Sequence, residues 1–306
     1  MFKKTLLLIA ALALAALILI VPAWPGTVPT SIVPEGARWV AHLDMEKFVA
    51  TKLYEYLEKD GRLQIKNRDI GRWLKIDLFK DITGLTVFGL ESGDKQAVFA
   101  VTGKFDKAGL LALLALDKDY QAIPYGSYTL YLTGSDEFGA FVNDGLIVFS
   151  ENREAVEKVL DTAAGKTKSF ASSKLNAAFK DVSSGTFLSG VVEDLAGLGK
   201  EINQSKFVEK ASMMFFLAQE KQDNLQVRVQ VTADSPESAK NMADVAQGLI
   251  AMVRLGQGEG PGGIPASLVE GLQVKLEGKT VRLELDMPSR EVANLAPRGR
   301  GLDLFD

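Results

Sequence analysis

The apolar run near the N-terminus constrains this chain more than any other feature. Lys3 and Lys4 come first, and an unbroken run of apolar residues extends from Leu6 to Val21. A short basic stretch ahead of such a run is typical of an export signal or of a single membrane anchor. Because basic residues stay on the cytoplasmic side, both interpretations place everything after the run outside the cytoplasm.

The residues that follow the run bear on whether it is cleaved. Val21-Pro22-Ala23 loosely fits the small-x-small rule for signal cleavage, so a cut after Ala23 is one outcome. With its flanks, however, the run approaches the roughly 20 residues that span a bilayer. Trp24 has the position of an interfacial aromatic, and Pro25 is unfavourable just after a cut site. We expect residues 1–24 to form a retained anchor in the inner membrane, with secretion after cleavage as the alternative.

Composition excludes several kinds of chemistry. The chain has no cysteine, which excludes disulfides, thiol catalysis and zinc–thiolate sites. Its single histidine cannot build a multi-histidine metal site. The net charge is −4, and it becomes −6 once the two positive charges of Lys3 and Lys4 are removed. Since a mildly acidic body disfavours nonspecific binding to nucleic acid, we expect no nucleic-acid partner. We also expect neither a cofactor nor a metal.

The order of the elements suggests a duplicated body. Residues 25–36 contain prolines and glycines and predict an extended spacer. Beyond it, a strand and a helix are followed by two hairpin-plus-helix units, and this order then recurs. We place the halves at 37–168 and 169–296, with a flexible tail at 297–306. This plan predicts an α+β fold with antiparallel sheets and helices packed on one face.

A short residue match supports the duplication. Gly84-Leu85-Thr86-Val87 aligns with Gly271-Leu272-Gln273-Val274, and each segment enters a strand that turns back through a short polar link. If the halves are repeats, these two segments should occupy equivalent strands.

Several helix boundaries follow from local signals. We expect one helix over Met45–Leu57 and another from about Glu151 to Ala164. Ser235-Pro236 predicts a helix start with proline at the first helical position, and acidic or hydroxyl caps are expected near Asp106 and Ser289.

The predicted sheets differ in their faces. Three strands of the second half alternate apolar and polar residues, so one face packs on helices and the other meets water or a polar partner. Its polar members form a candidate interaction face: Gln226, Arg228, Gln230, Gln273, Lys275, Arg282 and Glu284. Strands of the first half are apolar on both sides, so the other half, a partner subunit or an apolar ligand should cover its second face.

The sequence offers little for catalysis, and we predict no catalytic residue. His42 and Asp44 lie on the same side of one strand, as half of an acid–base pair would. We expect instead that Asp44 caps the next helix and that His42 is an ordinary strand residue. Ala164-Gly165-Lys166-Thr167 imitates the end of a phosphate loop, but it ends a helix, so we interpret it as a C-cap.

Two further segments carry weaker signals. The basic stretch Arg62–Lys80 predicts a short amphipathic helix, either an insertion that packs Trp73 on its own domain or an interfacial helix. In the tail, Leu302, Leu304 and Phe305 could dock on a sheet edge of a partner.

Together these observations favour a non-catalytic extracytoplasmic protein of the cell envelope that binds or scaffolds a partner. One alternative is an envelope hydrolase that uses carboxylates such as Asp44 or Glu91 in a cleft between the halves. Another is a carrier of an apolar ligand on the apolar face of the first half. The expected partners are the membrane, through an uncleaved N-terminal segment, and either a protein or an apolar ligand.

Overall fold

The computed structural model describes residues 29–63, 79–90, 97–134, 137–193, 195, 209–255 and 266–296. The N-terminal apolar run, most of the basic stretch with Trp73, Glu91 and the tail lie outside these residues. The described chain divides between Asp181 and Val182 into an N-terminal and a C-terminal unit. Both combine helices with antiparallel strands, which agrees with the predicted α+β class.

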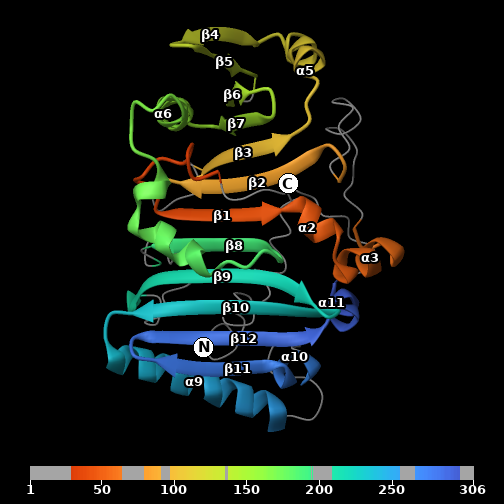
Figure 1. Ribbon diagram of the computed structural model, residues 1–306, viewed down its shortest axis with the longest axis vertical. Coiled ribbons are helices and arrows are strands. Elements are labelled where there is room, and N and C mark those ends of the chain that lie inside the picture. Colours follow the sequence, from red (N-terminus) through yellow and green to blue (C-terminus); the bar gives the residue numbers. More distant parts are fainter. Residues whose placement is uncertain are drawn as a thin grey trace. The chain divides into compact units, whose positions relative to one another are not determined.

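The N-terminal unit has the strand order β1-β2-β3-β7-β6-β5-β4. Its elements are β1 (Trp39–Asp44), α2 (Met45–Val49), α3 (Lys52–Lys59), β2 (Ile82–Gly89), β3 (Ala97–Gly103), α5 (Lys107–Leu114), β4 (Gln121–Tyr125), β5 (Tyr128–Leu132), β6 (Phe138–Asn143), β7 (Leu146–Ser150), α6 (Arg153–Ala163) and the 3-10 helices η2 (Phe170–Ser172) and η3 (Lys174–Asp181) (Figure 1).

The C-terminal unit has the strand order β8-β9-β10-β12-β11. Its elements are β8 (Thr186–Glu193), β9 (Ala211–Lys221), β10 (Asn224–Ala233), α9 (Pro236–Leu255), α10 (Ala266–Glu270), β11 (Leu272–Glu277), β12 (Thr280–Pro288) and α11 (Ser289–Leu295).

The two units share one strand order, but the residue match does not mark equivalent strands. In each unit the first three strands are neighbours in sequence order, and a later hairpin joins with its second strand inward, as β7 and β12 do. Gly84–Val87 lies in β2, the second strand of its order, whereas Leu272–Val274 lies in β11, at the far end. That alignment was wrong, because an apolar-x-Gly-Leu-x-Val pattern suits any strand that leaves a tight turn. The N-terminal unit also adds the hairpin of β4 and β5.

The predicted helix over Met45–Leu57 is broken by a threonine. The Thr51 hydroxyl donates to the Phe48 carbonyl at 2.6 Å and accepts from the Tyr54 amide at 3.0 Å. The same side chain therefore ends α2 and caps α3. A threonine hydroxyl can bond backbone groups that would otherwise bond each other within a continuous helix.

The segment at 29–36, expected to belong to a spacer, packs on the N-terminal unit. Val33 is fully buried, and its carbonyl accepts from the Phe170 amide at 2.7 Å. Pro34 forms a bridge with Ser169. These contacts place residues 169–181 with the first unit, so the division falls later in the chain than the expected 168/169 boundary.

Helix α6 covers the core face of the N-terminal unit. It packs on β3, β6 and β7. Its side of the sheet is lined by residues with no exposed surface, among them Phe88, Val98 and Val148. The Asn152 side chain accepts from the Ala155 amide at 3.0 Å and caps the helix, which begins close to the predicted Glu151.

Helix α9 has the corresponding role in the C-terminal unit. It begins at Pro236, as predicted, and runs along β11, β12 and β10 (Figure 1). Small residues such as Ala239 and Ala243 let it approach Val281 closely. Pro288 occupies the N-cap position of α11 without a side-chain hydrogen bond, and Ser289, the expected cap, is the first residue of the helix.

Among the described residues, no helix combines the length and the apolar character that crossing a membrane requires.

Candidate functional site

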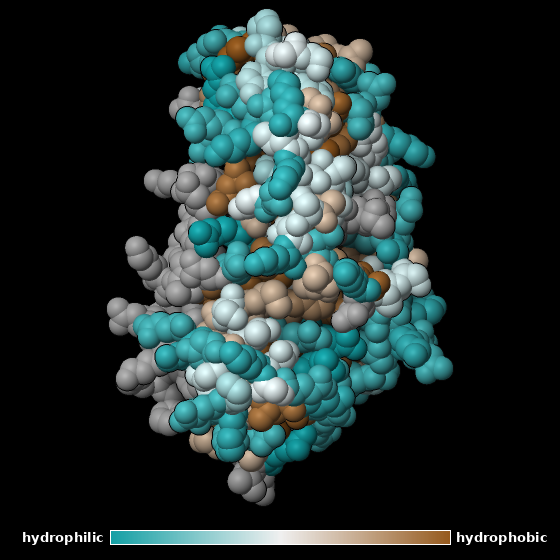
Figure 2. All heavy atoms as spheres, turned by 60° about the vertical axis from the view of Figure 1, so that its left-hand side comes forward, coloured by the Kyte–Doolittle hydropathy of each residue, from teal (hydrophilic) through white to brown (hydrophobic). Residues whose placement is uncertain are grey.

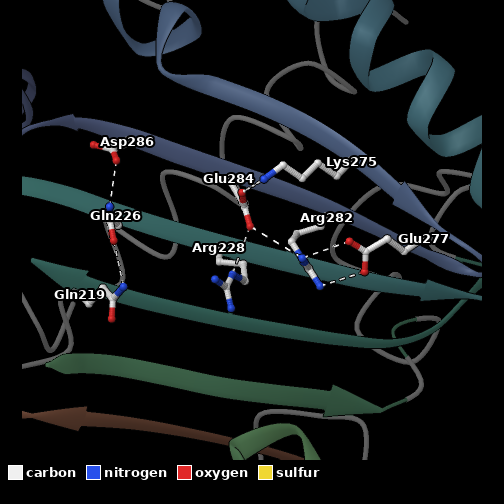
Figure 3. A network of polar contacts seen from close by, with 8 residues as sticks. All are labelled: Gln219, Gln226, Arg228, Lys275, Glu277, Arg282, Glu284 and Asp286. Carbon is white, nitrogen blue, oxygen red and sulfur yellow. Dashed lines mark hydrogen bonds and ion pairs between the residues drawn. The ribbon is translucent and has the colours of Figure 1, made fainter. Parts of the chain in front are cut away.

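The predicted polar residues of the C-terminal unit lie together on one face of β10, β12 and β11. Arg228 stands opposite Glu284, which stands opposite Gln273. In the next row, Gln230 stands opposite Arg282, which stands opposite Lys275. Figure 3 shows how most of these side chains meet across the strands. We call this surface the polar face: Gln219, Asn224, Gln226, Arg228, Gln230, Gln273, Lys275, Glu277, Arg282, Glu284 and Asp286.

Glu284 is at the centre of the charged part. Its carboxylate accepts from the Lys275 ammonium at 2.6 Å and lies 3.4 Å from the Arg228 Nε. The Arg282 Nη1 is 4.0 Å away. The hydrogen bond from Lys275 is the main reason that the pKa of Glu284 lies below its ordinary value, although partial burial opposes the shift. Glu284 therefore stays charged under all but acidic conditions.

A second carboxylate completes the balance. Arg282 binds Glu277 through both terminal nitrogens, at 3.3 and 3.2 Å. Arg282 and Lys275 are directly opposite each other, a like-charge pair that would be unfavourable alone. Glu284 on one side and Glu277 on the other offset that repulsion, so the alternating charges hold each other in place.

The other end of the polar face is a chain of amides. Gln219 donates to the Gln226 oxygen at 2.9 Å, and Gln226 donates to Asp286 at 2.9 Å. Asn224 donates to the second Asp286 oxygen at 2.7 Å. At the far end of this chain, the Ser183 hydroxyl contacts Gln219. This row fixes side chains from three strands, β9, β10 and β12.

Sequence reasoning missed four members of the polar face. Asp286 and Glu277 continue the alternation of their strands by one step, so the same period-two pattern could have included them. Asn224 likewise starts the alternation of β10. Gln219 joins only through the pairing of β9 with β10, which the pattern of one strand does not reveal.

On β9 the polar face gives way to buried apolar residues. Arg228 is opposite Leu217 and Gln230 is opposite Phe215, and both apolar side chains are buried. Figure 2 shows hydrophilic residues over most of the lower part of its view, where the C-terminal unit lies, with a small apolar patch among them.

The N-terminal unit has an apolar second face in place of a polar one. On the side of the strands away from Val98 and Val148, Phe99 and Phe149 stack at 5.1 Å between ring centroids. Leu85 and Val101 are buried beside them, while the two phenylalanines are only partly buried. Strands β2, β3 and β7 therefore carry apolar residues on both faces, as the sequence of this half indicates.

His42 and Asp44 occupy structural positions. Asp44 is 3% exposed; it accepts from the Lys47 amide at 2.9 Å and pairs with the Lys47 ammonium at 2.6 Å. It caps α2, as predicted. His42 is 5% exposed, with its Nδ1 at 2.9 Å from the Thr86 hydroxyl. In the part of the chain that the structure describes, no three His, Cys, Asp or Glu residues come together as metal ligands would.

The segment after α6 that imitates a phosphate loop is a helix C-terminus, as predicted. Gly165 has a φ of 73°, and the Lys166 amide donates back to the Asp161 carbonyl at 2.9 Å. The Lys166 ammonium binds the Asp161 carboxylate at 2.7 Å and, with the Tyr125 hydroxyl, holds the pKa of that carboxyl below its ordinary value.

Comparison with known proteins identifies a fold and no family. No family model matches the chain, and no curated protein matches it. Solved structures of TP0453 are similar: its crystal forms I, III and IV align with TM-scores of 0.53, 0.54 and 0.54. Each covers 88% of this chain and 96%, 98% and 96% of its own, at 11%, 11% and 10% identity. At such identities the likeness shows the fold alone.

Proposed function

We propose that this chain is a non-catalytic extracytoplasmic protein of the cell envelope that binds or scaffolds a protein partner through the polar face. Residues 1–24 would hold it at the outer side of the inner membrane, or release it after cleavage. The basic residues ahead of the apolar run support this location.

The contacts among the charged side chains of the polar face are the observation that carries the proposal. Glu284 contacts Lys275, Arg228 and Arg282, so these long side chains are already ordered before any partner arrives. Ordering such side chains on binding would otherwise cost roughly 0.5–1.5 kcal/mol each. Because the charges are paired, the face offers hydrogen bonds in fixed positions and attracts no single sign of charge. A polar protein surface with matching donors and acceptors is the partner that fits.

Crosslinked capture from the native membrane tests this proposal. We expect wild-type protein to retain a partner that Arg228→Ala loses. Arg153→Ala is the matched control, because Arg153 forms an exposed ion pair with Glu157 at 2.7 Å on α6, in the other unit. Capture of the same partner by the Arg228 and Arg153 variants alike would remove the polar face from the proposal.

The location has its own test. A periplasmic reporter fused after Asp306 should be active, and a cytoplasmic reporter at the same point should be inactive. The opposite pattern would contradict the extracytoplasmic assignment whatever the polar face does.

The partly exposed phenylalanines of the N-terminal unit favour a second candidate, a carrier of an apolar ligand. Phe99 and Phe149 lie in an apolar face with Val87 and Ile147, all partly buried. A carrier would bind a fluorescent apolar probe with saturation, and Phe99→Asp would abolish that binding while Arg228→Ala would not.

A further inference from the structure

The strand β11 lies at the end of the C-terminal sheet and has one open edge among the described residues. It pairs with β12 on one side, and no other described strand lies on its other side. A two-residue turn joins Glu277 to Thr280, so these two residues form a hydrogen-bonded pair and the antiparallel ladder alternates from there. At the other end, the Asp286 amide donates to the Gly271 carbonyl at 3.2 Å, in phase with that alternation.

The alternation identifies the backbone groups on the open edge. Gln273 and Lys275 direct their N–H and C=O groups toward β12, whereas Leu272, Val274 and Leu276 direct theirs away from it. Within the described residues, no hydrogen bond involves the outward groups of these three. They form a row of unused donors and acceptors that matches an added strand.

The edge strand of the N-terminal unit shows what a protected edge looks like. In β4, a two-residue turn joins Tyr125 to Tyr128, which makes these two residues a hydrogen-bonded pair. Counting back from Tyr125, the residues whose backbone groups are directed away from β5 are Ala122 and Pro124. Pro124 has no N–H to offer, and proline at this place blocks the addition of a strand. Strand β11 contains neither a proline nor a bulge.

The side chains on the open edge of β11 are also incompletely covered. Val274 packs partly against the cluster under α9, but Leu276 is 44% exposed. It is one of three large hydrophobic side chains that the described residues leave exposed, with Leu116 and Met252. The apolar row of the strand therefore ends uncovered, beside the unused backbone groups.

We propose that β11 pairs with β11 of a second copy of this chain, antiparallel, about a two-fold axis through Val274. Leu272 then lies opposite Leu276 of the second copy, and Leu276 lies opposite its Leu272. All three outward residues meet outward residues, so every exposed donor and acceptor in the row finds a partner. Both copies of Leu276 become covered.

Charge and the turn at Gly278 favour this register over those shifted toward the turn. With Val274 on the axis, Lys275 lies opposite Gln273 of the second copy, whose amide oxygen accepts from an ammonium group. Moving the axis to Lys275 would oppose two lysines, which is unfavourable. Moving it to Leu276 would run the pairing into the turn at Gly278, which has a φ of 57°.

A single cysteine can report this contact, because the chain has none of its own. We would introduce Val274→Cys into the full-length chain, oxidise native membranes with copper phenanthroline and separate the proteins without reductant. Residues opposite each other in a hydrogen-bonded pair have Cα atoms about 5.5 Å apart, within disulfide range. We expect a covalent dimer. Ala122→Cys, on the outward row of β4, is the matched control and should stay monomeric.

A second change tests whether the edge carries the contact. Leu276→Pro removes one outward N–H and keeps the pairing with β12, so it should abolish the crosslink of Val274→Cys. Leu116→Lys, which changes a 72% exposed leucine of the other unit, should leave the crosslink intact. If Val274→Cys fails to fold, chains with Gln273→Cys and Lys275→Cys, co-expressed, should crosslink to each other.

Three outcomes would overturn the proposal. They are a monomer in every β11 cysteine variant, a crosslink that Leu276→Pro does not reduce, and a crosslink of equal yield from Ala122→Cys. In the last case, random collision within the membrane would explain the dimer, and pairing at the β11 edge would not be needed.

Discussion

The two units arrange their first strands in the same order but treat the second face of the sheet in opposite ways. In the N-terminal unit that face holds the stacked pair of Phe99 and Phe149. In the C-terminal unit it holds the Glu284 network. The helix-covered faces, under α6 and α9, are apolar in both. The strand order is thus compatible with either surface, and the second face is where units of this architecture can differ in what they bind.

The largest effect should come from the face that the units have in common. Val229 is 3% exposed on the helix side of β10, and Val229→Asp would bury a charge without a partner. We expect a loss of about 4 kcal/mol or more, enough to unfold the C-terminal unit.

Two optical signals separate the units in this experiment. All three tryptophans precede Val182, so tryptophan fluorescence follows the N-terminal unit alone, while far-UV circular dichroism follows both. The dichroism should fall sharply in Val229→Asp. An unchanged unfolding curve would mean that the faces of β10 are assigned the wrong way round.

The apolar second face should contribute an intermediate amount of stability. Phe99→Ala removes one ring of the stacked pair, and since Phe99 is only partly buried we expect a loss of about 2 kcal/mol, below the 3–5 of a fully buried phenylalanine. Urea unfolding followed by tryptophan fluorescence measures it. Gln226→Ala, on the polar face of β10, should cost much less, as measured by urea unfolding followed by far-UV circular dichroism; equal costs would erase the contrast between the units.

The Glu284 network should make a smaller and pH-dependent contribution. Glu284→Gln leaves Lys275, Arg228 and Arg282 with less negative charge between them, at a cost of about 1 kcal/mol near neutral pH. The folded pKa of Glu284 lies below its ordinary value of 4.5, so its stabilisation is complete above that pH and is lost as pH falls through the folded pKa.

Urea unfolding of wild type and Glu284→Gln from pH 7 to pH 3 tests this sign. The two free energies of unfolding should converge on acidification, because the other carboxylates act equally in both proteins. A difference that stays constant or grows would show that Glu284 gains nothing from Lys275.

The smallest effect should come from Arg228→Ala. Its contact with Glu284 is partly exposed and 3.4 Å long, so we expect a change of about 0.5 kcal/mol or less in the unfolding free energy. A loss of several kcal/mol in the unfolding free energy, seen by far-UV dichroism, would mean that this side of β10 packs against other residues, as the second face of the N-terminal sheet does.

Strand alternation explains why much of the polar face could be predicted. Period two is a local property, so Gln226, Arg228 and Gln230 are assigned to one side of β10 without any knowledge of its neighbours. The pairing of Arg228 with Glu284 is different, because it joins residues far apart in the chain. Register of that kind depends on the whole sheet, and a single sequence does not contain it.

Local competition accounts for the remaining differences. One threonine, Thr51, was enough to split a helix that apolar spacing alone makes continuous. Strand β4 was missed because it is short, exposed and contains Pro124, which argues against a strand unless the strand is at an edge. The repeated Gly-Leu-x-Val pattern led to a wrong alignment because it is not specific: many strands that follow a turn satisfy it.

The turn at Gln222 and Asp223 has a consequence for the speed of folding. Both residues have positive φ, 52° and 61°, in a two-residue link between β9 and β10. This conformation favours Asn-Gly, so neither residue is the preferred one. The hairpin closes over a short loop, which is entropically cheap, whereas β10 must wait for the distant β12. Asp223→Gly should therefore hasten hairpin closure yet leave the overall folding rate nearly unchanged, because the search of Thr280–Pro288 for β10 remains the slow step.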